Sequence, residues 1–132
     1  DLLFFGEAQL ERQNWQTLFA LLIHATGKRL LGIQASQLAA ITDWLVRERK
    51  SEPLTVCAVG PRSCLIALIA TLLNPDSIDK LQLHGCLDSL SAAIEQNWTV
   101  DKAPELFCFG LLQVTDIPHL LPLLEPKSIV RH

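Results

Sequence analysis

The residue types that could carry chemistry are concentrated in the segment Gly60-Pro61-Arg62-Ser63-Cys64. A short apolar run rich in β-branched residues, 54–59, stops at Gly60, and an apolar run of helical character starts at once. This order predicts a strand, a tight turn and a helix, which is a setting in which enzymes hold a serine nucleophile. Ser63 is the only serine near the turn, and Arg62 stands beside it.

Each of these residues also has a structural interpretation. A serine at the start of a helix accepts a hydrogen bond from a free backbone amide, so an N-cap role is favoured for Ser63 over that of nucleophile. Arg62 could bind an anion at the helix N-terminus, where free amides attract negative charge, but a solvated or ion-paired side chain is favoured. Gly60 completes this candidate set because a residue without a side chain permits the tight turn.

The acid and the base that a nucleophile needs are harder to assign. Asp88 follows the second predicted strand and is a weak candidate acid, although an N-cap role for Asp88 or Ser89 is favoured. Any of the four histidines could act as a base, since histidine titrates near neutral pH; they are His24, His84, His119 and His132. We expect His24 to be a core or boundary residue with a hydrogen-bonded ring, and we keep His132, the last residue, as a weak catalytic candidate.

The cysteine spacing does not predict a metal site. Cys57, Cys64, Cys86 and Cys108 are 7, 22 and 22 residues apart, so the chain has no close pair of the kind that zinc sites use. We expect buried free thiols, with one disulfide as the alternative. The chain also lacks G-x-G-x-x-G and P-loop motifs, so no nucleotide cofactor is predicted.

Length and composition favour one domain over residues 1–132. Hydrophobic residues make up 49% of the chain and charged residues only 19%, which indicates either a sheet buried on both faces or a piece of a larger domain. The net charge of −3 and the scattered basic residues argue against nucleic-acid binding. No apolar run approaches the roughly 18 residues of a membrane span. The chain begins with Asp1 and contains no methionine, which is typical of a processed chain or a fragment.

The hydrophobic pattern predicts a mixed succession of helices and strands. Helices are expected over 7–26, 35–49, 63–73, from 88 or 89 to 97, and briefly over 117–124; strands are expected over 54–59, 78–84 and 127–131, with 2–5 as a strand end and 104–116 irregular. Residues 54–84 have the length and order of a βαβ unit, so the two strands should be adjacent and parallel. Their runs are continuously apolar, which predicts helices on both faces of the sheet.

Several segments match, in order, the pattern of one known family. They are Asp1-Leu-Leu-Phe-Phe-Gly-Glu7, which is similar to that family's D-x-R-G-x-G-E strand end, residues 30–45, the turn at 60–64, residues 72–78 and 83–89, and the stretches 110–121 and 124–130. On these segments the chain resembles the acetyl xylan esterase-like branch of the α/β-hydrolases, particularly large bacterial multidomain proteins. The resemblance implies an α/β fold of three layers (αβα) with a mainly parallel sheet, ester hydrolysis by a Ser–acid–His triad, and an extracytoplasmic location.

The chain departs from this family at the residues that would carry out catalysis. In the family's G-x-S-x-G elbow, Arg62 stands where the serine belongs and Cys64 where the second glycine belongs. The early strands, the loop that gives the first oxyanion amide and the family's histidine have no counterpart between Asp1 and His132.

The sequence therefore predicts a triad-incomplete portion of a hydrolase-like domain, the C-terminal part of a larger unit and non-catalytic by itself. It should self-associate or pack against a missing part of the same protein, because open sheet edges and apolar patches need a cover. Two alternatives remain: an ester hydrolase whose other catalytic residues lie outside this chain, and a small doubly wound ligand-binding module.

Overall fold

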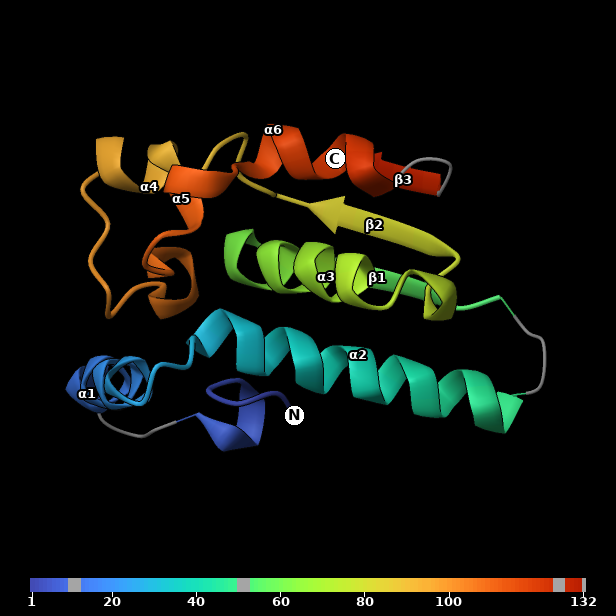
Figure 1. Cartoon of the computed structure of the whole chain (residues 1–132), viewed down its shortest axis with the longest axis horizontal. Helices are drawn as coiled ribbons and strands as arrows, with labels where there is room; N and C mark the ends of the chain where they lie inside the picture. Colours follow the sequence, from blue (N-terminus) through green and yellow to red (C-terminus); the bar gives the residue numbers. More distant parts are fainter. Residues whose placement is uncertain (10–12, 50–52, 125–127, 132) are drawn as a thin grey trace.

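The computed structural model describes residues 1–9, 13–49, 53–124 and 128–131. These residues form helices packed against a three-stranded, all-parallel sheet in the order β1-β2-β3 (Figure 1). The strands are β1 (Thr55–Val59), β2 (Lys80–His84) and β3 (Ser128–Arg131). The predicted α/β class and the predicted parallel pairing of the first two strands are both confirmed.

Helix α3 (Pro61–Leu73) connects β1 to β2 and lies against the sheet. Its first residue is a proline, whose fixed φ angle suits the first position of a helix. The helix is apolar almost all round, so it must be covered on more than one side. The sheet covers one side, and α2 covers another.

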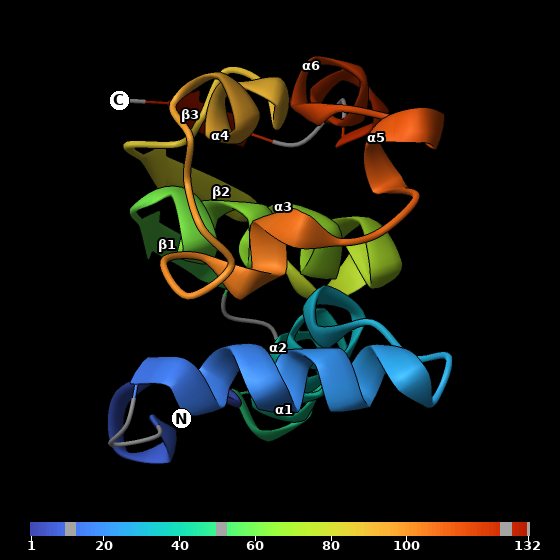
Figure 2. The same ribbon diagram turned by 90° about the vertical axis from the view of Figure 1, so that its left-hand side faces the viewer.

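Helices α1 (Gln13–Ala25) and α2 (Leu30–Arg49) form the outer part of the helical layer that contains α3. Helix α2 lies beside α3, whereas α1 crosses α2: it is seen end-on in Figure 1 and lengthwise in Figure 2. The sequence placed the start of α2 at Ala35, but the helix begins at Leu30. Both Leu30 and Leu31 are buried, so packing extends the helix through Gly32 despite the low helix propensity of glycine.

The remaining elements are short. They are the 3₁₀ helices η1 (Gly6–Ala8), η2 (Pro75–Ser77), η3 (Pro104–Phe107) and η4 (Leu121–Leu124), and the α-helices α4 (Ser91–Glu95), α5 (Leu111–Val114) and α6 (Ile117–Leu120). The strand end expected at residues 2–5 is wrong, because this segment turns at Phe4, whose φ is 65°, and packs on α2. The stretch 104–116, expected to be irregular, contains η3 and α5.

Burial along the strands shows which face of the sheet is covered. In β2, Leu81 and Leu83 are fully buried and face α3, and in β1 Ala58 is buried beside them. The alternate residues of β1, Thr55, Cys57 and Val59, are exposed, so the described residues cover only one face of this strand. The expectation that Cys57 is a buried thiol is therefore wrong.

Candidate functional site

The turn between β1 and α3 is formed by Gly60. Its φ and ψ are 86° and 160°, a combination that is almost restricted to glycine, and its amide donates a hydrogen bond of 2.8 Å to the carbonyl oxygen of His84. In a nucleophile elbow the residue on the strained turn between strand and helix is the nucleophile itself. Here the strained conformation is that of Gly60, two residues before Arg62, where the resemblance places the nucleophile.

The residue after Gly60 also differs from the corresponding residue of a nucleophile elbow. The oxyanion hole of these enzymes uses the backbone N–H of the residue that follows the nucleophile. Here that residue is Pro61, which has no N–H. The turn therefore lacks both a nucleophilic side chain and the amide that would stabilise an oxyanion beside it.

Ser63 is the third residue of α3, and the N-cap position is taken by Gly60. The N-cap role expected for Ser63 is wrong, because Pro61 moves the start of the helix two residues earlier than the sequence pattern suggested. No hydrogen bond between described residues joins Ser63 to a histidine or to Asp88. The side chain is half-buried and borders a hollow of about 350 Å³ at the turn, together with Arg62, Trp98 and Lys102. We call this space the turn hollow.

Arg62 is ion-paired, as the favoured interpretation of the sequence predicted. Its Nε and Nη2 atoms donate to the two carboxylate oxygens of Glu105 over 2.8 and 2.7 Å. Glu105 is completely buried, whereas 23% of the Arg62 side chain is exposed. The Arg62 guanidinium also lies over the ring of Phe5, 4.6 Å from its centroid. The arginine is thus held by a fixed partner on each side.

A second residue completes the environment of Glu105. The Nε2 atom of Gln34, also fully buried, donates to Oε1 of Glu105 over 2.9 Å and to the carbonyl oxygen of Leu3 over 2.8 Å. A buried carboxylate is stable only when it is paired and hydrogen-bonded. Sequence analysis missed Glu105 because its segment gave no periodic pattern; the signal was an acidic residue inside the apolar run 103–107.

Asp88 is not a helix cap. Its side chain is 97% exposed and forms an ion pair of 2.9 Å with Arg131 of β3. Helix α4 starts after Leu90, whose amide is bound by the carboxylate of Asp116, and the hydroxyl of Ser89 accepts from the amide of Ser91. Ser89, the other cap candidate, therefore supports the start of this helix. Asp116 supports it too, although the sequence did not suggest this residue.

Asp116 joins two short helices. Its Oδ1 atom accepts from the amides of Leu90 and Ile117, each over 2.7 Å, and Oδ2 accepts from the hydroxyl of Ser89. Burial alone raises the pKa of the Asp116 carboxyl, but the hydrogen bonds from Leu90, Ser89 and Ile117 together lower this pKa below its ordinary value. The carboxylate therefore stabilises the starts of α4 and α6 in its charged form.

The histidines are spread over the fold. His24 is half-buried in α1 with its ring edge-on to Phe109, the ring centroids being 5.0 Å apart, and burial followed by the charge of Arg29 lowers its pKa. The intermediate exposure of His24 fits the predicted boundary position. The expectation of a hydrogen-bonded ring is wrong, because neither buried ring nitrogen has a hydrogen-bond partner among the described residues. His84 ends β2, and His119 is exposed in α6. His132 lies outside the described residues.

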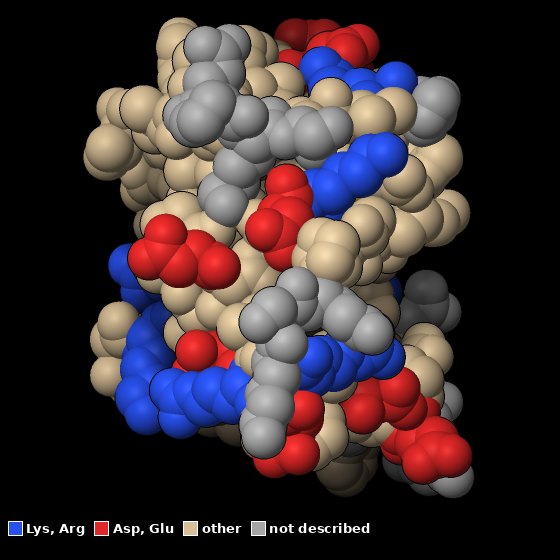
Figure 3. All heavy atoms as spheres, turned by 90° about the vertical axis from the view of Figure 1, so that its right-hand side faces the viewer, with Lys and Arg blue, Asp and Glu red and all other residues tan. Residues whose placement is uncertain are grey.

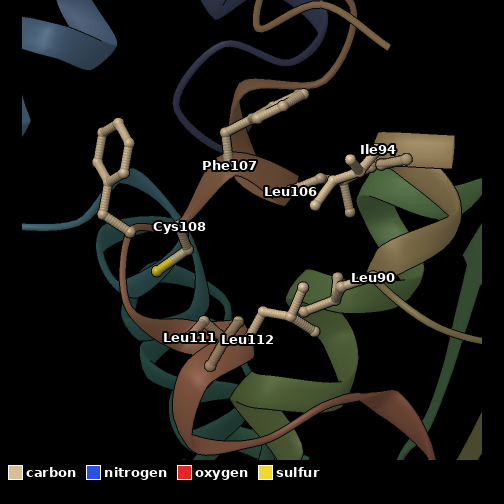
Figure 4. Close-up of a pocket in the computed structure, with 9 residues that line it drawn as sticks. Leu90, Ile94, Leu106, Phe107, Cys108, Leu111 and Leu112 are labelled. Atoms are coloured by element: carbon tan, nitrogen blue, oxygen red, sulfur yellow. The ribbon is translucent and has the colours of Figure 1, made fainter. Parts of the chain in front are cut away.

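Two further hollows are mainly apolar. A groove of about 470 Å³, which we call the edge groove, runs along β1 and is bordered by Val56, Val59, Leu38 and Ile41. A smaller pocket of about 140 Å³ lies between α4, η3 and α5, where Figure 4 shows Ile94, Leu106 and Phe107 around it and the thiol of Cys108 nearby. The residues bordering this pocket carry no histidine or acidic group among those described.

The surface gives no sign of a charged binding face in the view of Figure 3. Basic and acidic side chains are interspersed there, without a broad patch of one sign among the described residues. Among the residues that the structure describes, no group of three or more histidine, cysteine or acidic residues could hold a metal ion. None of the helices described has the length and apolar character needed to cross a bilayer.

Comparison with known proteins adds no family assignment. No protein-family profile matches the chain, and neither the curated protein sequences nor the solved structures give a match. A function for this chain must therefore be argued from its residues and their geometry.

The first prediction concerns the buried ion pair. The change Glu105→Gln removes the charge that neutralises Arg62, so we expect a loss of about 3 kcal/mol in the free energy of unfolding, measured by urea denaturation. The double change Arg62→Met with Glu105→Leu should recover part of this loss, because it removes both charges. Asp88→Asn is the matched control, since it breaks an exposed ion pair and should have little effect. Equal losses for Glu105→Gln and Asp88→Asn would contradict this interpretation.

The second prediction concerns pH. The folded state lowers the pKa of Asp116, so its carboxylate contributes stability that is fully present above the unfolded-state value near 3.8 and is lost as the pH falls through the lower folded-state value. Asp116→Asn should therefore be less stable than the unmodified protein at neutral pH, and this difference should shrink in strong acid. The measurement is the free energy of unfolding across pH, with Asp43→Asn at an exposed pair as control. A difference that stays constant down to strong acid would refute the assignment.

Proposed function

We propose that the chain is a non-catalytic, triad-incomplete portion of an α/β-hydrolase-like domain related to carbohydrate esterases. Three parallel strands in consecutive order, with α3 entered through a tight turn directly after β1, support this relationship. The observation that carries the non-catalytic part is the sequence of the turn. Gly60 occupies the strained position and Pro61 follows it, which supports the proposal of an elbow that has lost its chemistry.

Neighbouring residues do not replace the missing groups. A nucleophile needs a base within hydrogen-bond reach, and Ser63 has no such histidine or carboxylate partner among the described residues. The guanidinium of Arg62 is bound on one side by the buried carboxylate of Glu105. We therefore assign the chain no cofactor and a structural role for its turn.

The proposed role is to pack against another part of the same protein or another copy of this chain. The outer face of β1 is exposed, and its outer edge is paired with no described strand. A second helical layer on that face would complete the three-layer arrangement that the resemblance implies. Helix α1 likewise presents Trp15, Leu18 and Leu22, each about half exposed, at the spacing of one helix face. We propose neither a nucleic acid nor a membrane as partner, and an extracytoplasmic location follows from the resemblance.

One observation favours a second candidate function, that of a ligand-binding module. The turn hollow lies at the carboxyl end of β1, which is where ligands bind in open α/β sheets. Lys102 stands at this hollow with its ammonium 3.7 Å from the centroid of the Trp98 ring. An ester hydrolase that takes its remaining catalytic residues from outside the chain would use the same place.

The third prediction tests the absence of catalysis. The protein should not hydrolyse p-nitrophenyl acetate above the uncatalysed rate, and Gly60→Ser should not change this because Pro61 offers no amide to the oxyanion. Ser63→Ala tests whether the serine next to Arg62 acts as a nucleophile. Turnover that is abolished by Ser63→Ala would overturn the proposed function and identify Ser63 as the nucleophile.

The fourth prediction tests the open apolar surfaces. Because these surfaces lack a cover, the isolated chain should self-associate, and sedimentation velocity should show species larger than the monomer. Leu18→Glu places a charge on the exposed face of α1 and should shift the distribution towards monomer. Gln113→Glu, at an exposed polar position of α5, is the matched control and should not. A soluble monomer of the unmodified chain would count against the proposed role.

A further inference from the structure

The turn hollow combines apolar walls with a small number of polar groups. Its volume of about 350 Å³ lies within the range of cavities that bind small molecules. Apolar side chains make up most of its border: Phe5, Val59, Pro61, Trp98 and Ala103. The side chain of Val59, at the end of β1, is 69% exposed, so apolar surface is open to a ligand beside the turn. These walls suit a ligand with an apolar body.

The charges around the turn hollow do not cancel. Two of the described residues that border it are basic, Arg62 and Lys102, and none of them is acidic. The charge of Arg62 is balanced by Glu105, whose oxygens accept from Nε and Nη2 over 2.8 and 2.7 Å. Lys102 forms no ion pair with a described residue. One positive charge therefore remains uncompensated at the border of the hollow.

Lys102 is held in a position from which it can donate to an anion. Its ammonium lies over the Trp98 ring, 3.7 Å from the centroid, and the hydrogen atoms that point away from the ring stay free to donate. The indole N–H of Trp98 donates to Oε1 of Gln96 over 3.1 Å. The amide of Lys102 donates to the carbonyl oxygen of Thr99 over 3.0 Å. Both side chains are thus anchored in the same loop after α4.

The first turn of α3 supplies further donors at the same hollow. The first hydrogen bond of this helix runs from the amide of Cys64 to the carbonyl oxygen of Gly60 over 3.0 Å. The backbone amides of Arg62 and Ser63, which both border the hollow, therefore have no acceptor among the described residues. The Ser63 hydroxyl also has no hydrogen-bond partner there. A Cβ atom placed on Gly60 would meet nothing within 4 Å beyond its neighbours in the chain, so the backbone of the turn is open to a ligand. These donors add to the attraction that Lys102 exerts on an anion.

We propose that the turn hollow binds a small monocarboxylate, with its charged group at Lys102 and Ser63 and its apolar body against Val59 and Pro61. A single negative charge matches the single uncompensated positive charge. A phosphate would bring a second charge without a partner, and a neutral ligand would leave Lys102 unused. The assignment rests on the second candidate function, that of a ligand-binding module, and names its class of ligand. It does not depend on descent from an esterase.

The experiment titrates the whole chain with sodium benzoate at constant ionic strength. Benzoate is a monocarboxylate with a flat apolar body, and proton–nitrogen correlation spectra follow the indole N–H resonances of the chain. Trp98 borders the hollow, whereas Trp15 and Trp44 lie on α1 and α2 and serve as internal references. Trp98→Phe assigns the resonance. We expect a saturable shift of the Trp98 resonance, with the other two unchanged.

A change at Lys102 gives the decisive comparison. Lys102→Gln removes the charge at an exposed position and should raise the dissociation constant of benzoate about tenfold, the loss expected for one charge-assisted hydrogen bond. Lys28→Gln is the matched control, because it removes the same charge at an exposed position that does not border the hollow. It should leave the dissociation constant unchanged. Ser63→Ala should weaken binding by a smaller factor, since it removes a neutral donor.

A short series of probes separates the class of ligand from the existence of the site. Benzamide, the neutral counterpart of benzoate, and inorganic phosphate should each bind more weakly than benzoate. If benzamide or phosphate binds as tightly as benzoate, the monocarboxylate assignment is overturned while the ligand-binding candidate stands.

Two other outcomes overturn both the assignment and the ligand-binding candidate. One is that no probe shifts the Trp98 resonance. The other is that Lys28→Gln weakens the binding of benzoate as much as Lys102→Gln does, which would show attraction by net charge alone. The main proposed function is tested separately, by ester turnover and by sedimentation.

Discussion

The carboxylate of Glu105 is the group on which the arrangement of this chain depends. It lies fully buried in η3 and is neutralised by Arg62 of α3, while Gln34 of α2 donates to it and to the backbone of Leu3. Three segments that are distant in sequence thus meet at one charge, and a fourth is tied to them through Gln34. A buried carboxylate permits few alternative geometries, because each arrangement that loses a partner leaves a charge unsatisfied in a low-dielectric interior. This constraint gives a small apolar fold one specific way to assemble.

The same interaction explains why an arginine stands next to the turn. In a catalytic interpretation Arg62 looks like a replacement for a nucleophile, but its partners show a structural function. The guanidinium connects the first turn of α3 to η3 and covers the ring of Phe5. Packing and charge compensation thus explain why an arginine stands at position 62, where the resemblance places a nucleophile.

Much of the fold was predictable because local patterns decided it. The β1–α3–β2 unit follows from two apolar runs separated by a glycine–proline turn, and its parallel pairing follows from its length. The start of α2 was misplaced because tertiary packing of Leu30 and Leu31 overrides the weak helix propensity of Gly32. The continuous apolar run of β1 predicted burial on both faces, yet the described residues cover only one.

The site was less predictable than the fold because its geometry depends on dihedral angles and on distant partners. The resemblance placed the nucleophile of the segment 60–64 at Arg62, whereas the strained φ and ψ are those of Gly60, and residue types alone do not reveal such angles. Glu105 and Asp116 act through contacts with residues far along the chain, for which periodicity gives no signal. The local sequence suggested that Asp88 caps a helix. The amide of Leu90, before the start of that helix, is instead bound by the carboxylate of Asp116 from another segment.

The pairing of Gly60 with Pro61 also has an evolutionary consequence. If the chain descends from an esterase, regaining an elbow requires a side chain at the first position and an N–H at the second, and either substitution alone gives no activity on which selection could act. Pro61 in turn suits the first position of α3, so replacing it would weaken the start of the helix before any benefit arose. Under that descent, loss of the chemistry at this turn would be effectively one-way, and selection on the turn would act on the folded shape alone.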